Sequence, residues 1–112
     1  MSVYVSNIVI EQGFDFETNF VLEDSRTNAL INLTGYTVES QIRKTYTAST
    51  AVSLAATTIN PTQGEVRISL GSTITTTLKE GRYVYDVKAT TGTGDVLKLV
   101  EGAALVRPGV TR

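Results

Sequence analysis

The sequence predicts an all-β protein, a sandwich of about seven short strands in a single domain that spans residues 1–112. About a third of the residues are Val, Ile or Thr, and their branched side chains fit a pleated strand better than a helical turn. Turn signals recur at intervals of roughly 10 residues, with segments of period two between them. A chain of 112 residues is long enough for one hydrophobic core.

The first quarter of the chain contains two predicted strands and a turn. Residues 3–11 form a strand with apolar side chains on both faces, which indicates burial on both faces or a surface that meets a partner. Residues 14–23 alternate Phe14, Phe16 and Phe20 against charged and polar side chains, so this strand has one buried face. Residues 24–28 form a turn, because Asp, Ser and Asn side chains bond to nearby backbone groups.

The middle of the chain contains three more predicted strands. Gly35 precedes the strand at 36–43, where the backbone needs a conformation that a Cβ would obstruct. The Thr-rich residues 45–50 form a surface loop. Residues 52–59 form a strand that is closed by a turn at 60–64, and residues 65–70 alternate cleanly between apolar and polar side chains.

The last third begins with a break in the strand pattern at residues 72–80. Here Ser72 can cap a helix of at most one or two turns, and Gly81 ends it. Residues 81–89 form a Tyr-rich strand, and a hairpin loop at 91–94 returns the chain along residues 96–107. Gly102 in this last strand predicts a bulge. The complete set of strands matches an immunoglobulin-like β-sandwich.

The order of landmarks along the chain carries a resemblance to a protein family. The landmarks are Leu33-Thr34-Gly35-Tyr36, Gly64-Glu65-Val66, the strand at 81–89, Val100-Glu101-Gly102 and Pro108-Gly109-Val110-Thr111. From residue 5 to residue 112 this order resembles small β-sandwich virion structural proteins of tailed phages, including cyanophages. The Leu-Thr-Gly-Tyr element is more distantly similar to one in the N-terminal domain of phage upper baseplate proteins. The resemblance implies a component of the virion that is assembled in the host cytoplasm.

The composition argues against an enzyme, a metal site and a cofactor. The chain has no His and no Cys, so the usual general base, thiolate nucleophile and zinc ligands are missing. Asp15 and Glu17 share one face of a predicted strand and could in principle serve as a pair of catalytic carboxylates. They are better explained as the solvated face opposite Phe16 and Phe20.

Charge and hydropathy exclude two classes of partner. The net charge is −1 and the charges are scattered, whereas binding to nucleic acid needs clustered Lys and Arg. No apolar run approaches the roughly 18 to 20 residues that cross a bilayer. Residues 1–10 contain no Lys or Arg before their apolar positions, so we expect no secretory signal.

We therefore expect a non-enzymatic protein–protein docking module of a tailed phage, at the tail or baseplate as a fibre adaptor. The partners are other virion proteins, with a homo-oligomer also possible. The expected interface residues are Val3, Tyr4, Val5, Tyr46, Arg107, Val110 and Arg112.

Two alternatives remain open at this point. One is a capsid decoration or cement protein. The other, from a different class, is a glycan-binding, adhesin-like module. The second ranks lower, because most aromatic side chains alternate into the predicted core and the chain has no Trp; Tyr46 in its loop is the exception.

Overall fold

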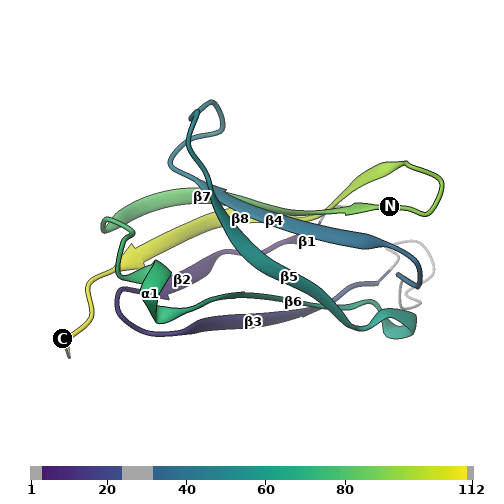
Figure 1. The fold of residues 1–112 in the computed structure, drawn as a ribbon, viewed down its shortest axis with the longest axis horizontal. Helices are drawn as coiled ribbons and strands as arrows, with labels where there is room; N and C mark the ends of the chain where they lie inside the picture. The colour runs from purple at the N-terminus through teal and green to yellow at the C-terminus, as the bar shows by residue number, and fades with distance from the viewer. Residues whose placement is uncertain (1–3, 24–31, 111–112) are drawn as a thin grey trace.

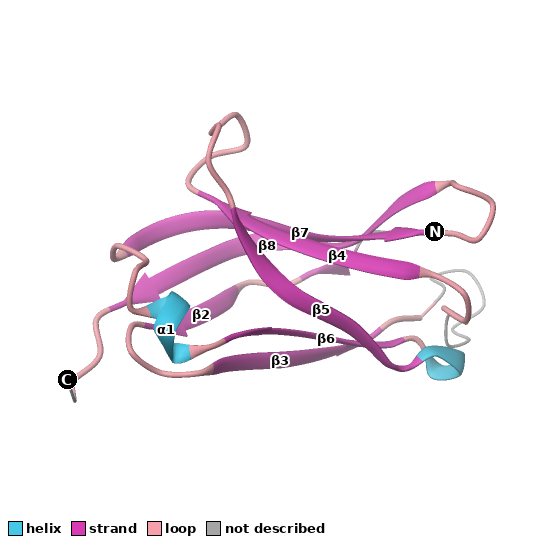
Figure 2. Ribbon diagram, in the orientation of Figure 1, coloured by secondary structure: helices cyan, strands magenta, loops and turns pink. Residues whose placement is uncertain are grey.

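A computed structural model of the chain describes residues 4–23 and 32–110. The strands are β1 (Tyr4–Val5), β2 (Ile8–Glu11), β3 (Phe16–Val21), β4 (Thr37–Arg43), β5 (Val52–Asn60), β6 (Glu65–Leu70), β7 (Gly81–Thr90) and β8 (Val96–Arg107). A helical turn, α1 (Ser72–Thr75), and a 3-10 turn, η1 (Pro61–Gln63), complete the described elements (Figure 2). The prediction of an all-β fold is confirmed. The predicted turn at 24–28 lies outside the described residues.

The strands form one sheet that curls over itself. Its order is β1-β8-β7-β4-β5-β6-β3, and β2 continues the line of β1 along β8. Strand β5 belongs to two layers, because residues 52–54 pair with β4 whereas residues 55–60 pair with β6. Figure 1 shows β4, β7 and β8 in one layer, β3 and β6 in the other, and β5 passing from the first to the second. The immunoglobulin-like arrangement stays a prediction.

One hydrophobic core lies between the two layers. It takes Ile10 from β2, Ile42 from β4, Ile68 from β6, Val87 from β7 and Leu99 from β8, all of them almost completely buried. Within β2, β6 and β7 the buried residues fall at alternate positions, as the period of two predicts. Burial of a side chain of this size stabilises the fold by roughly 1.5–3 kcal/mol.

The predicted first strand at 3–11 is broken at Ser6 and Asn7 into β1 and β2. Both parts run parallel to β8. At the break, the Ser6 amide donates to the Glu101 carbonyl (3.0 Å), and the Ala103 amide donates to Asn7 Oδ1 (3.0 Å). The Tyr85 hydroxyl donates to the Ser6 carbonyl. The strand is therefore fastened to β7 and β8 at the point where it breaks.

The prediction of a bulge at Gly102 is wrong. The register between β7 and β8 shifts between Val87 and Lys88, opposite Leu99, and Leu99 and Val100 are both buried although they are consecutive. Gly102 pairs with Tyr85 in regular register, and a Cβ at this position would collide with the Ser6 carbonyl. The glycine is needed because the backbone of the broken strand passes directly over it.

The predicted cap of α1 is also wrong. Gly71 occupies the N-cap position. The Ser72 amide, which is the first amide of the helix, donates to Oδ1 of Asp15 (2.7 Å), the residue directly before β3. Thr75 is completely buried below this turn. Its Oγ1 accepts from the Gly13 amide (3.2 Å) and donates to the Phe14 carbonyl (2.9 Å), so α1 is joined to the β2–β3 turn. That turn places Phe14 before β3 instead of in it, with 44% of Phe14 exposed.

Candidate functional site

An apolar patch lies on the solvent-facing side of the layer that contains β8. We define the outer patch as Val5, Val9, Val84, Ala103 and Leu105. The register places Leu105 beside Val9 on β2 and Ala103 beside Val84 on β7. Val5 is 69% exposed, Val9 47% and Leu105 39%. Scattered single apolar residues are normal on a surface, whereas neighbouring ones on adjacent strands are typical of interaction sites.

Charged side chains of both signs surround the outer patch. At one end Arg107 pairs with Glu11, with 2.6 Å between Arg107 Nη2 and Glu11 Oε1. At the other end Lys98 lies 3.3 Å from Glu101 and 3.9 Å from Asp86. An apolar centre with a polar, solvated rim is the usual anatomy of a protein–protein interface.

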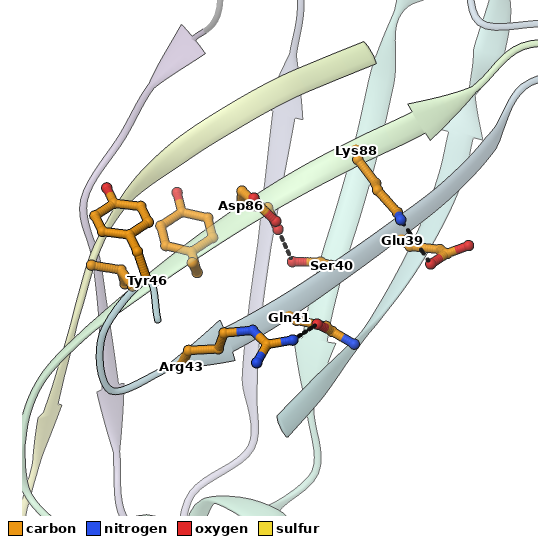
Figure 3. A pocket seen from close by; sticks show the side chains of 9 residues that line it. Glu39, Ser40, Gln41, Arg43, Tyr46, Asp86 and Lys88 are labelled. Atoms are coloured by element: carbon orange, nitrogen blue, oxygen red, sulfur yellow. Dashed lines mark hydrogen bonds and ion pairs between the residues drawn. The ribbon is translucent and has the colours of Figure 1, made fainter. Parts of the chain in front are cut away.

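A shallow groove of about 280 Å³ continues the same face across β4 and β7. It is lined by Glu39, Ser40, Gln41, Arg43, Tyr46, Val84, Tyr85, Asp86 and Lys88. Figure 3 shows Tyr46 at one end of the groove and the side chains of Glu39 and Lys88 at the other. The groove shares Val84 with the outer patch, so the two features form one continuous surface.

The polar groups of this groove already have partners within the protein. Lys88 Nζ lies 3.8 Å from Glu39 Oε2. Arg43 donates through Nη2 to Gln41 Oε1 (3.1 Å) and through Nη1 to the Ala48 carbonyl (2.5 Å), which ties the loop at 45–50 to β4. Ser40 Oγ donates to the Asp86 carbonyl (2.6 Å). Arg43 therefore sets the position of the loop that carries Tyr46.

The buried hydroxyl of Tyr85 lies beneath this surface. Burial raises the pKa of Tyr85 to about 12 from its ordinary value of 10.0, although the side chain of Ser6 opposes the change. The group is therefore neutral at physiological pH. It acts as a fixed donor that holds Ser6, and with it the strand from which Val5 and Val9 project.

The predicted interface residues fall into separate regions of the structure. Val5 is in the outer patch, Arg107 is in its rim, and Tyr46, 73% exposed, lies at the end of the groove. Tyr4 is on the other side of its strand, where its ring meets that of Phe20 edge-on with 6.0 Å between centroids. Val110, 95% exposed, follows β8. Val3 and Arg112 lie outside the described residues.

The interface residues predicted from the sequence do not include Val9, Val84, Ala103 or Leu105. The sequence contains a signal for an exposed apolar surface, because residues 3–11 carry apolar side chains on both faces. Ala103 and Leu105 also occupy alternate positions of β8. The pattern shows which side chains share a face of one strand. Only the pairing of β2, β8 and β7 brings these residues into one patch.

The carboxylates considered for catalysis have structural partners. Asp15 caps α1, and Glu17 Oε1 lies 2.6 Å from Arg67 Nε on the neighbouring strand. Within residues 4–23 and 32–110 no group of three or more carboxylates could hold a metal ion. No helix in this part of the chain is long and apolar enough to cross a membrane.

Comparisons with known proteins leave the family open. No protein-family profile and no curated protein matches the chain. Among solved structures, an internalin-like protein of Listeria monocytogenes is similar with a TM-score of 0.47 and 16% sequence identity, over 94% of this chain and 28% of that one. The chain thus spans less than a third of the length of this structure.

Proposed function

We propose that this chain is a non-enzymatic module that docks onto another protein through the outer patch. The observation that carries the proposal is the pairing of Val9 with Leu105 and of Val84 with Ala103 on adjacent strands of one face, inside a rim of paired charges, with the exposed Val5 on the same face. Removing these side chains from water is favourable in proportion to the apolar area that is covered. The Glu11–Arg107 and Lys98–Glu101 pairs can remain solvated at the rim, where they favour a matching partner at little cost.

The resemblance of the landmarks suggests where the module works. We propose a structural role in the virion of a tailed phage, at the tail or baseplate, where the chain would hold a fibre or another tail protein. Each copy would need only a modest affinity, because several copies in a symmetric particle bind together. A capsid decoration protein is the competing placement within the same class.

Labelling the chain in intact particles distinguishes the two placements. We expect signal confined to the tail. Signal over the whole shell would favour the decoration protein, and particles that never contain the chain would exclude both.

Paired serine variants test the surface itself. Val9→Ser and Leu105→Ser remove apolar area from the centre of the outer patch, and we expect their incorporation into particles to fall. Ile59→Ser is the matched control, because Ile59 is also 39% exposed and belongs to β5, away from the patch. Equal incorporation of the patch variants and the control, with all of them folded, would overturn the docking proposal.

The groove beside Tyr46 keeps a second candidate, a glycan-binding module. An exposed Tyr ring with Gln41, Arg43 and Asp86 nearby could stack on a sugar and bond to its hydroxyls. Arg43 already donates to the Ala48 carbonyl, and Lys88 already pairs with Glu39. This argues against glycan binding, because both side chains would first have to give up these partners. A glycan array with wild type and Tyr46→Ala tests it, and sugar binding that Tyr46→Ala abolishes would favour this candidate.

A further inference from the structure

Strand β3 is at one end of the sheet, and its register with β6 shows which of its backbone amides and carbonyls point away from β6. Strand β3 pairs with β6 on one side and is the last strand of the sheet among the described residues. The Leu22 amide donates to the Gly64 carbonyl (3.0 Å), which makes residues 22 and 64 a hydrogen-bonded pair. Hydrogen-bonded pairs alternate along an antiparallel ladder. Phe16, Thr18 and Phe20 therefore bond to β6, and the amides and carbonyls of Glu17, Asn19 and Val21 point away from it.

Within residues 4–23 and 32–110, this edge carries little of the usual protection against strand addition. Natural edges are blocked by Pro, by bulges, by charged side chains, especially Lys, by very short strands, or by a covering helix or loop. Residues 16–21 form an uninterrupted strand with the sequence Phe-Glu-Thr-Asn-Phe-Val. The opposite end of the sheet is different, because β1 has 2 residues and β2 has 4, with a break at Ser6 and Asn7 between them. Among the strands that the structure describes, only β3 offers a continuous template of edge backbone groups.

The side chains around the β3 edge define what a partner strand must present. Toward the core, the ring of Tyr4 from β1 meets Phe20, and Tyr4 remains 50% exposed while Phe16 is only partly buried. On the outer side, Glu17 Oε1 lies 2.6 Å from Arg67 Nε on β6, and the half-buried Glu65 and the exposed Glu23 add two further carboxylates. Side chains alternate between the two faces of a strand. A complementary segment is therefore apolar at every second position and basic at the positions between.

We propose that the β3 edge is a second binding site, which takes an extended, basic and alternately apolar segment of a partner protein as an added strand. Backbone bonds to Glu17, Asn19 and Val21 supply the register. The apolar side chains of the segment cover Tyr4 and Phe16, and its basic side chains face Glu17 and Glu65. A second copy of this chain fits less well, because its own β3 carries Glu17 and is followed by Glu23, which would bring acidic side chains to an edge that is already acidic.

The site is independent of the outer patch, which lies on the other layer. Tyr4 and Val5 thus belong to different surfaces, although both project from β1. Variants of Val9 or Leu105 are expected to leave binding at the β3 edge unchanged, so failure of one proposal does not decide the other.

The test uses a synthetic peptide, Lys-Val-Lys-Val-Lys-Val-Lys, and nuclear magnetic resonance of the labelled full chain. We expect the amides of Glu17, Asn19 and Val21 to exchange quickly in the free protein and to become protected when the peptide is added. A peptide of the same composition in blocked order, Lys-Lys-Lys-Lys-Val-Val-Val, controls for simple charge attraction. A third peptide with Glu in place of each Lys is expected to bind more weakly.

Two variants at one position separate backbone recognition from loss of a side chain. Asn19→Pro removes an amide that faces away from β6, so the ladder is retained, whereas Asn19→Ala keeps the amide. We expect Asn19→Pro to bind the alternating peptide at least about tenfold more weakly than Asn19→Ala. If Asn19→Pro does not fold, the protection pattern of the wild type still decides.

Three results would overturn the proposal. The first is equal binding of the alternating and blocked peptides, or no binding of either at millimolar concentration. The second is protection at strands other than β3. The third is protection of Glu17, Asn19 and Val21 without peptide, together with dimerisation, which would assign the edge to a second copy of the chain.

Discussion

Gly102→Ala gives the sharpest test of how the broken N-terminal strand is held. A Cβ at this position would overlap the Ser6 carbonyl and approach Asn7 Oδ1 to 3.2 Å. Gly102 is not among the described glycines with positive φ, so the expected penalty is a collision of backbones and not a strained dihedral angle. Overpacking of this kind costs roughly 1–3 kcal/mol.

Movement of Ser6 would add to this cost. The displacement would weaken the bond from Tyr85 and leave its buried hydroxyl without an acceptor, which costs about 1–3 kcal/mol. Because the two terms share one displacement, we expect a total loss of about 3 kcal/mol in the free energy of unfolding. For a domain of this size that loss lowers the Tm by roughly 10–20 °C.

The assay is urea unfolding followed by far-ultraviolet circular dichroism, since the chain has no Trp. Gly92→Ala is the matched control, because a Cβ at Gly92 would meet nothing within 4 Å. We expect the control to lie within about 0.5 kcal/mol of wild type. If Gly102→Ala is as stable as Gly92→Ala, the fastening of Ser6 over β8 is refuted as a source of stability.

Three further predictions concern individual side chains. Thr75→Val keeps the volume of a completely buried residue but removes the partner of Gly13 and Phe14, so we expect a loss of about 2 kcal/mol in urea unfolding; the exposed Thr76→Val should change stability by less than about 0.5 kcal/mol. The pKa of Tyr85 is about 12 in the folded protein and 10.0 in the unfolded chain, so its contribution to stability is complete below pH 10 and is lost as the pH rises toward 12. Between pH 10 and 12 the free energy of unfolding of wild type should therefore fall by about 2–3 kcal/mol more than that of Tyr85→Phe. Parallel curves for these two proteins would contradict the stated cause. Glu17→Gln breaks an exposed ion pair with Arg67 and should change the free energy of unfolding by less than about 1 kcal/mol. A larger loss in a thermal unfolding measurement would contradict the small contribution expected of a solvent-exposed pair.

Local patterns predicted most of the strands. Residues 65–70 and 96–107 were placed with the observed bounds, and Gly35 has the positive φ of 81° that its position before β4 suggested. These predictions succeed because alternation and turn residues are properties of neighbouring positions. The Thr-rich loop at 45–50 was likewise recognisable from its lack of pattern.

Errors arose where a contact between distant residues decides the local structure. The cap of α1 is supplied by Asp15, 57 positions before Ser72, and sequence reasoning assigned it to Ser72 itself. The bulge lies at Leu99 because β7 and β8 change register there, whereas Gly102 is required by Ser6. Neither partner is visible from the residues next to the glycine or the serine.

Local sequence pattern is enough to predict that the chain is β-rich, where most of its strands and turns lie and which side chains of a strand share a face, because these properties depend on a period of two and on single turn residues. Pairing between distant strands sets the parallel position of β1 and β2 beside β8, the passage of β5 between the two layers, and the place of β3 at the end of the sheet among the described residues. These features depend on hydrogen-bond pairing between strands that are far apart in the chain. Alternation in one strand says which side it buries but not which strand lies beside it, and both proposed binding surfaces are made by such neighbours.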